Sequence, residues 1–161
     1  MRLILILLAA FVIPAAASAE ECTYTDLHGE FTVSVPCDLM QDFSGHSQDH
    51  KRMWLGGKLN QLQIMEAPEP YRTADTGHVI STLGRDFGRF RTPRPIAEAT
   101  FAGIQGHVVT QGRRQHTSRS WVFNFKGRNL IARLVAFGPR KGRMDRLDEA
   151  ARLFEGGFKA N

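Results

Sequence analysis

Cationic side chains are concentrated in one stretch of the sequence. Between Arg113 and Arg146 there are ten arginine or lysine residues and a single carboxylate, Asp145. Between Glu20 and Glu66, eight carboxylates accompany three basic residues. Guanidinium groups bind oxyanions, and charge of one sign attracts ligands of the other. Binding of an anionic partner is therefore the first chemistry to consider. The alternative is that these charges only keep a small domain in solution.

The elements around this stretch decide whether its charges can meet. Residues 104–111, 118–126 and 129–137 are predicted strands, and the short link at Lys126-Gly127-Arg128 predicts a tight hairpin. Because antiparallel strands alternate in direction, loops 112–117 and 138–142 should lie at the same end of the sheet. The N-terminus of the next predicted helix would add partial positive charge there. The candidate anion-binding or partner-binding residues are Arg113, Arg114, His116, Arg140, Lys141 and Arg143.

Histidines suggest a weaker alternative, a metal site. His46 and His50 would share one face of a helix, but Ser44-Gly45 and the lack of an apolar period argue against a helix there. Zinc takes three or four protein ligands, and the spacing fixes no third. Surface histidines in a loop are the preferred interpretation, and we expect no cofactor.

Catalytic motifs are not found in the sequence. It contains no G-x-S-x-G elbow, no H-E-x-x-H pair and no glycine-rich phosphate loop. Asp26, Glu30 and Asp38 could converge as paired carboxylates, but no nucleophile accompanies them. We therefore expect a protein that is not an enzyme. A small envelope enzyme or metal-binding protein that uses the loop histidines is the alternative.

The N-terminus predicts export. Arg2 precedes an apolar run over residues 3–13, Pro14 ends it, and Ala17-Ser18-Ala19 provides a small-x-small cleavage site. The run is shorter than the roughly 20 residues that span a bilayer. Residues 1–19 are therefore predicted to be a signal peptide, with an uncleaved anchor as the alternative. The periplasm is the favoured location and the extracellular space the alternative.

Two cysteines support an oxidising compartment. Cys22 and Cys37 form an even pair, which in an exported protein predicts a disulfide. This bond would hold the mature N-terminus against the first predicted strand. A redox-active or metal-binding pair is the competing interpretation, but the C-x-x-C spacing that it requires is lacking.

Periodicity in residues 20–161 predicts a single α+β domain. Strands are expected at 30–35, 52–55, 59–67 and 96–101, the middle two joined by a turn at Gly56-Gly57. Apolar residues at helical spacing predict two helices: Val79, Ile80, Leu83 and Phe87 after a cap at Thr73 or Asp75, and Met144, Leu147, Ala151 and Phe154 before Gly156-Gly157. Both faces of 129–137 are apolar, so this strand should be central. We expect an antiparallel sheet of about six strands with two helices packed on it, on opposite faces or mostly on one.

This order of elements resembles the PsbP/DcrB-like superfamily. The resemblance rests on the run EFTVSVP, a hairpin, a helix, further strands, and a closing helix with an aromatic tail at Phe154 and Phe158. It implies an α/β/α sandwich and a non-catalytic accessory role at a membrane surface or in an exported complex. The cysteine pair has no counterpart that we can match to that superfamily.

Together these features predict a soluble exported accessory or binding protein of the cell envelope. Its partner would be an anionic envelope component or an acidic protein surface, and the mature form would have no transmembrane span. Nucleic acid is excluded by the compartment and because Trp121 and Phe123, the aromatics among the charges, share a predicted core face with Phe125. Trp54 and Tyr71 are further candidate contact residues.

Overall fold

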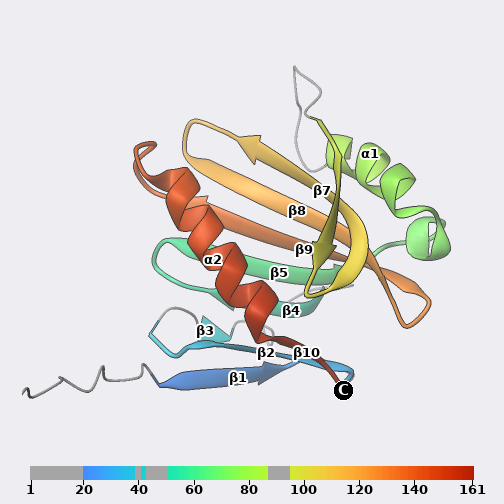
Figure 1. Ribbon diagram of the computed structural model, residues 1–161, viewed down its shortest axis with the longest axis horizontal. Coiled ribbons are helices and arrows are strands. Elements are labelled where there is room, and N and C mark those ends of the chain that lie inside the picture. The colour runs from blue at the N-terminus through green and yellow to red at the C-terminus, as the bar shows by residue number, and fades with distance from the viewer. Residues whose placement is uncertain (1–19, 39–40, 43–50, 87–94) are drawn as a thin grey trace, which may run out of the picture.

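A computed structural model describes residues 20–38, 41–42, 51–86 and 95–161 (Figure 1). The predicted signal peptide, His46, His50 and Phe87 lie outside the described residues. Within the described part, no helix is long and apolar enough to cross a membrane.

An antiparallel sheet of seven strands forms the centre of the fold, in the order β3-β4-β5-β9-β8-β7-β6. The strand bounds are β3 Gln41–Asp42, β4 Lys51–Gly56, β5 Asn60–Glu66, β6 Ala97–Phe101, β7 Ile104–Gly112, β8 His116–Phe125 and β9 Arg128–Phe137. Strand β9 lies in the middle, between β5 and β8. Its residues are buried on both faces, as its apolar sequence predicts.

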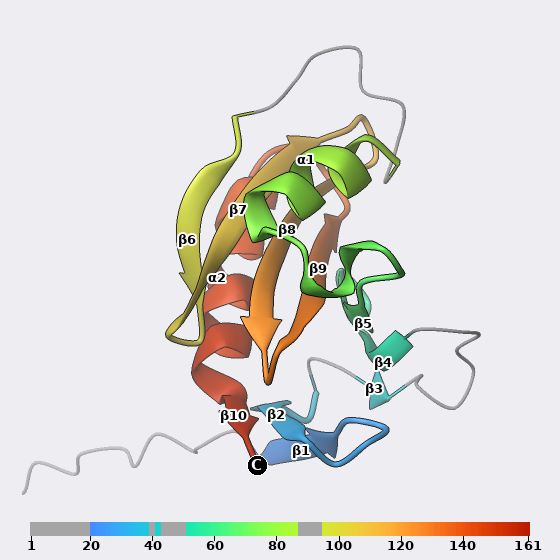
Figure 2. The same ribbon diagram turned by 90° about the vertical axis from the view of Figure 1, so that its right-hand side faces the viewer.

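One helix packs on each face of this sheet. Helix α2, Arg143–Gly157, covers the face that carries Trp121, Phe123 and Leu134. Helix α1, Thr76–Asp86, follows the short helix η2, Tyr71–Thr73, and packs with Val122 and Ile131 on the other face. Figures 1 and 2 show the two helices on opposite sides of β7, β8 and β9. The open choice between one face and two is therefore resolved in favour of an α/β/α arrangement.

The helix boundaries have local causes. Asp75 caps α1, because its carboxylate accepts a hydrogen bond from the amide of His78 at 2.9 Å. The buried residues of α2 are Arg143, Leu147, Ala150, Ala151 and Phe154. The prediction that Met144 belongs to this apolar face is wrong. Its side chain is 44% exposed, and Arg143 occupies the buried position.

A second, three-stranded sheet was not predicted. It consists of β1, Glu21–Thr25, β2, Phe31–Pro36, and β10, Phe158–Ala160, in the order β1-β2-β10. Cys22 and Cys37 are disulfide-bonded, with their Cα atoms 4.8 Å apart, so the bond joins β1 to the end of β2 as expected. Of the two residues of the aromatic tail, Phe154 lies in α2 and Phe158 starts β10, where it stacks on Phe31 at 5.1 Å between ring centroids.

Candidate functional site at the basic end of the sheet

The two loops predicted to meet do lie at one end of the sheet. His116, the first residue of β8, pairs with Phe137, the last residue of β9. The β7–β8 turn and the β9–α2 loop are therefore neighbours, at the same end as the N-terminus of α2 (Figure 1). We call the exposed cations of these loops, Arg113, Arg114, Arg140 and Lys141, the basic end.

Arg143 connects the two loops from within. Its side chain is 3% exposed. The guanidinium donates from Nη1 to the carbonyl of Arg113 at 2.9 Å and from Nη2 to that of Arg114 at 3.2 Å, and both Nε and Nη2 donate to the carbonyl of Gly138. Arg143 was predicted as a contact residue. Its buried donors make it a positioning residue for the loops.

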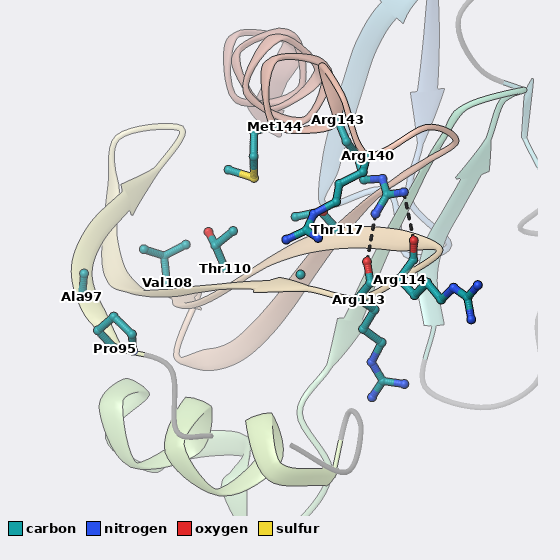
Figure 3. Close-up of a pocket in the computed structure, with 11 residues that line it drawn as sticks. Pro95, Ala97, Val108, Thr110, Arg113, Arg114, Thr117, Arg140, Arg143 and Met144 are labelled. Carbon is teal, nitrogen blue, oxygen red and sulfur yellow. Dashed lines mark hydrogen bonds between the residues drawn. The ribbon is translucent and has the colours of Figure 1, made fainter. Parts of the chain in front are cut away.

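A cleft of about 880 Å³ lies beside these loops, between the first turn of α2 and the β6–β8 part of the sheet. It is lined by Pro95, Ala97, Val108, Thr110, Gly112, Arg113, Arg114, Thr117, Arg140, Arg143 and Met144. Figure 3 shows the guanidinium of Arg140 directed into the cleft, whereas the side chains of Arg113 and Arg114 extend away from it. The arginines thus share one end of the molecule without converging on a single point.

Most other cations of the basic stretch have partners within the protein. Arg119 pairs with Asp148 at 2.6 Å, and Arg128 pairs with Glu30 at 2.7 Å. Arg146 donates to two loop carbonyls. Among the described residues, Arg114, Arg140 and Lys141 form no ion pair. They are the charges left for an external partner.

His116 lies next to these charges. Burial lowers the pKa of its imidazole below the usual 6.5, and the positive charges of Arg113, Arg133 and Arg143 lower the pKa further. His116 is therefore neutral near pH 7. An anion bound at this end would have arginine and lysine as its charged partners and would meet a neutral imidazole.

The N-terminus of α2 attracts an external anion less strongly than its dipole alone suggests. Gly142 caps it in a left-handed conformation, with φ of 69°, and no side chain caps the helix. Asp145 lies in the first turn, where a carboxylate interacts favourably with the dipole and competes with any external anion. The arginine and lysine side chains must therefore provide most of the attraction.

Comparisons with known proteins find similarity in structure alone. No family model matches the chain, and no curated protein matches it in sequence. The solution structure of cyanobacterial PsbP (CyanoP) from Synechocystis sp. PCC 6803 matches with a TM-score of 0.59 at 11% identity, covering 92% of this chain and 97% of that one. The chain has a PsbP-like fold.

A second match extends the description of the fold from PsbP-like to PsbP/Mog1-like. The Ran-binding protein Mog1p of Saccharomyces cerevisiae matches with a TM-score of 0.58 at 10% identity, covering 89% of this chain and 96% of that one. A structure from Bacteroides thetaiotaomicron matches with a TM-score of 0.52 at 11% identity, and 48% of that chain is covered. The resemblance inferred from element order is thus confirmed at the level of the fold.

At the opposite end of this PsbP/Mog1-like fold, the acidic residues have arginine partners. Arg52 is 3% exposed and pairs with Asp26 and, at 2.7 Å, with Glu30. Glu66 forms an ion pair with Arg72 at 2.8 Å. Burial alone would raise the pKa of Asp26, but hydrogen bonds from the Phe31 amide, the Arg52 guanidinium and the His28 amide hold it below its ordinary value.

This network changes the interpretation of the carboxylates. Asp26 and Glu30, considered as catalytic candidates, are ion-paired with Arg52 of β4 and hold the β1–β2 turn to the main sheet. Asp38 lies elsewhere, at a small cavity beside α2. The network joins residues far apart in the sequence, so no local pattern could have revealed it. Among the described residues, no group of three His, Cys, Asp or Glu side chains could hold a metal ion.

Proposed function

We propose that this protein is an exported, non-enzymatic binding protein that holds an anionic partner at its basic end. The observation that carries the proposal is the set Arg114, Arg140 and Lys141, three cations on two adjoining loops that form no ion pair with any residue the structure describes. Arg143 fixes the backbone of both loops, so the charges are presented on a rigid support. Fixed complementary charge of this kind favours encounter and orientation of an anionic surface.

Export is supported by the predicted signal peptide and by the disulfide between Cys22 and Cys37. The resemblance to PsbP-like proteins implies an accessory role. Mog1p, with the same fold, is a Ran-binding protein, which supports a protein as the partner here. The positive charge of the basic end would select an acidic surface on that protein. Anionic phospholipid at the membrane surface is the other source of the same charge, and the experiment must separate the two.

The test measures binding of the purified protein to two anionic probes. One is a phosphatidylglycerol-containing phosphatidylcholine vesicle, with pure phosphatidylcholine as its control, and the other is poly-L-glutamate. The variant Arg114→Gln/Arg140→Gln/Lys141→Gln removes the basic end. A matched control, Lys58→Gln/Arg152→Gln/Lys159→Gln, removes the same charge from exposed positions elsewhere.

We expect the basic-end variant to bind at least one probe on the order of a hundredfold more weakly, because each cation near an anionic surface contributes about 1 kcal/mol. The control variant should retain binding. Loss with vesicles alone identifies lipid, and loss with poly-glutamate alone identifies an acidic protein. Equal weakening in both variants would show that overall charge matters and would contradict a site at this end.

A further inference from the structure

One side of the cleft at the basic end is apolar. Ala97 pairs with Val108 across β6 and β7, so their side chains share one face of the sheet and form the floor of the cleft. Met144 extends towards them from the first turn of α2, and Pro95 lies at the edge (Figure 3). The cleft volume of about 880 Å³ falls in the range of small-molecule sites, roughly 300–1,000 Å³.

Met144 presents an apolar side chain to this cleft. It is 44% exposed, whereas Arg143 and Leu147 of the same helix are buried. An exposed methionine adds little to the core, but its flexible and polarizable side chain packs well on ligands. Its place beside the cleft is therefore better explained by a bound apolar group than by the packing of α2.

Arg140 directs a positive charge into the same cleft. Its guanidinium points inward, whereas the side chains of Arg113 and Arg114 extend away and the guanidinium of Arg143 donates to loop carbonyls (Figure 3). The residues that line the cleft include no carboxylate. A guanidinium in such surroundings binds an external carboxylate through two parallel hydrogen bonds. The cleft thus combines one cation with an apolar floor.

The uncharged side chains of the cleft offer few hydrogen bonds to a ligand. Those that can hydrogen-bond are Thr110 and Thr117. The hydroxyl of Thr110 accepts from Nε of Arg119 at 3.2 Å, and Thr117 is only 6% exposed. A peptide placed here would lose hydrogen bonds that its backbone makes with water. A hydrocarbon chain loses none and gains free energy with each CH₂ that leaves water.

We propose that the cleft binds a fatty acid, a single hydrocarbon chain with one carboxylate. The carboxylate pairs with Arg140, and the chain lies between Met144 and the floor of Ala97 and Val108. This proposal goes beyond the anionic surface proposed for the basic end, because it assigns an apolar chain to the cleft. Arg140 is the residue that the two proposals share.

Dodecanoate, kept below its critical micelle concentration, is the probe that tests the proposal. It is titrated into isotopically labelled protein, and the methyl groups of Ala97, Val108 and Met144 are followed by NMR. Octanoate is the control with a shorter chain. Dodecyltrimethylammonium is the control with the same chain and the opposite charge.

Three variants assign the contacts. Met144→Gln removes the apolar contact at nearly constant size, and Arg140→Gln removes the cation. Leu153→Gln is the matched control, because Leu153 is an apolar residue of α2 with a similar exposure of 37% and is not among the residues that line the cleft.

We expect saturable shifts of the three methyl signals with dodecanoate. Octanoate should bind more weakly by on the order of a hundredfold, because each buried CH₂ changes affinity about fourfold. Met144→Gln and Arg140→Gln should each weaken dodecanoate binding about tenfold, and Leu153→Gln should leave it unchanged. Dodecyltrimethylammonium should bind more weakly than dodecanoate, because Arg140 repels its charge.

Three results would overturn the proposal. The methyl signals could stay unchanged with dodecanoate, the cationic analogue could bind as tightly as dodecanoate, or Leu153→Gln could weaken binding as much as Met144→Gln. The last two would indicate adsorption on apolar surface without a site. Met144→Gln retains Arg114, Arg140 and Lys141, so it should bind poly-L-glutamate or anionic vesicles as the unaltered protein does. Failure of this proposal is therefore distinguishable from failure of the proposed function.

Discussion

At the scale of single residues, arginine has three different tasks in this protein. Arg52 neutralises buried carboxylates, and Arg143 donates to loop carbonyls from inside the fold. Arg140 extends its guanidinium into a cleft (Figure 3). The residue type is the same, so burial and partners separate structural arginines from those free to bind. Substitutions should separate them in the same way.

Replacing Arg52 by Met should destabilise the protein by about 3–5 kcal/mol, because it leaves Asp26 as a buried charge without its cation. Chemical denaturation measures the change. Arg140→Met, the matched control on a side chain that forms no ion pair in the described part of the chain, should alter the free energy of unfolding by less than about 0.5 kcal/mol. Comparable losses in the two variants would contradict the assigned roles.

The ion pair of Asp26 and Arg52 predicts how the stability of the protein depends on pH. The pKa of Asp26 is lowered in the folded protein, so its contribution is present above the unfolded-state value near 3.8 and is lost as pH falls through the folded-state pKa. Acid unfolding of the native protein should therefore steepen below about pH 4. In Asp26→Asn this steeper loss of stability should be missing. An acid-unfolding profile equal to that of the native protein would contradict the role of Asp26.

His116 also makes stability fall as pH falls, but for a different reason: folding disfavours its charged form, whereas folding favours the charged form of Asp26. Its pKa is lowered on folding, so below about pH 6.5 the unfolded chain binds more protons and the folded state loses stability. The loss of stability between about pH 7.5 and about pH 5.5 should be smaller in His116→Gln. An unchanged loss of stability in His116→Gln would contradict the assignment.

At the scale of elements, the junction between α2 and β10 shows how closely the second sheet is packed. A Cβ atom on Gly157 would lie 1.9 Å from the carbonyl oxygen of Ser34, whereas one on Gly156 would meet nothing within 4 Å. Both glycines belong to α2. The pair therefore offers two substitutions with opposite expected signs.

Gly157→Ala should cost about 3 kcal/mol or more, since the backbone of β2 must shift to make room. Gly156→Ala should instead gain up to about 1 kcal/mol from the better helix propensity of alanine. Thermal unfolding of both variants provides the measurement. Equal changes would indicate that α2 and β2 are not in the contact described.

The disulfide acts on another part of the same sheet. Its sequence separation is 15 residues, and in the chain-entropy model a loop of that length corresponds to about 3 kcal/mol. Cys22→Ala/Cys37→Ala should lower the free energy of unfolding by about that amount, with no change in anion binding, because the bond lies in β1–β2 and the basic end does not. A loss of binding in the folded variant would show that the two regions are coupled.

At the scale of the whole molecule, alternation and order of elements predicted most of the architecture. The apolar faces of β9 predicted its central place, and alternating strand directions predicted that the β7–β8 turn would meet the β9–α2 loop. The second sheet was missed because β10 has three residues and β1 has no fully buried side chain. Strands this short gain their pairing from tertiary contacts, which no local pattern records.

The candidate sites were predicted less completely, for a physical reason. Sequence reasoning treats arginine as exposed, so it placed Arg143 at the surface, although Arg143 lies on the same helix face as Leu147 and Phe154. A polar side chain that interrupts an apolar period was the available signal.

The two ends of the molecule differ in how far their charges are paired. At one end, Asp26, Glu30 and Glu66 pair with arginines, so that charge is largely neutralised. At the other end, Arg114, Arg140 and Lys141 have no ion pair among the described residues. The difference between the two ends, more than the total charge of the chain, is what an anionic partner would recognise.

Mapping that recognition tests the central claim most directly. Backbone amide NMR of the purified protein, titrated with a short poly-glutamate peptide, should show saturable shifts at residues 113–117, at residues 138–142 and in the first turn of α2. The shifts should weaken with added salt. Shifts of equal size around Lys58, Arg152 and Lys159, or no shifts at the basic end, would contradict the account.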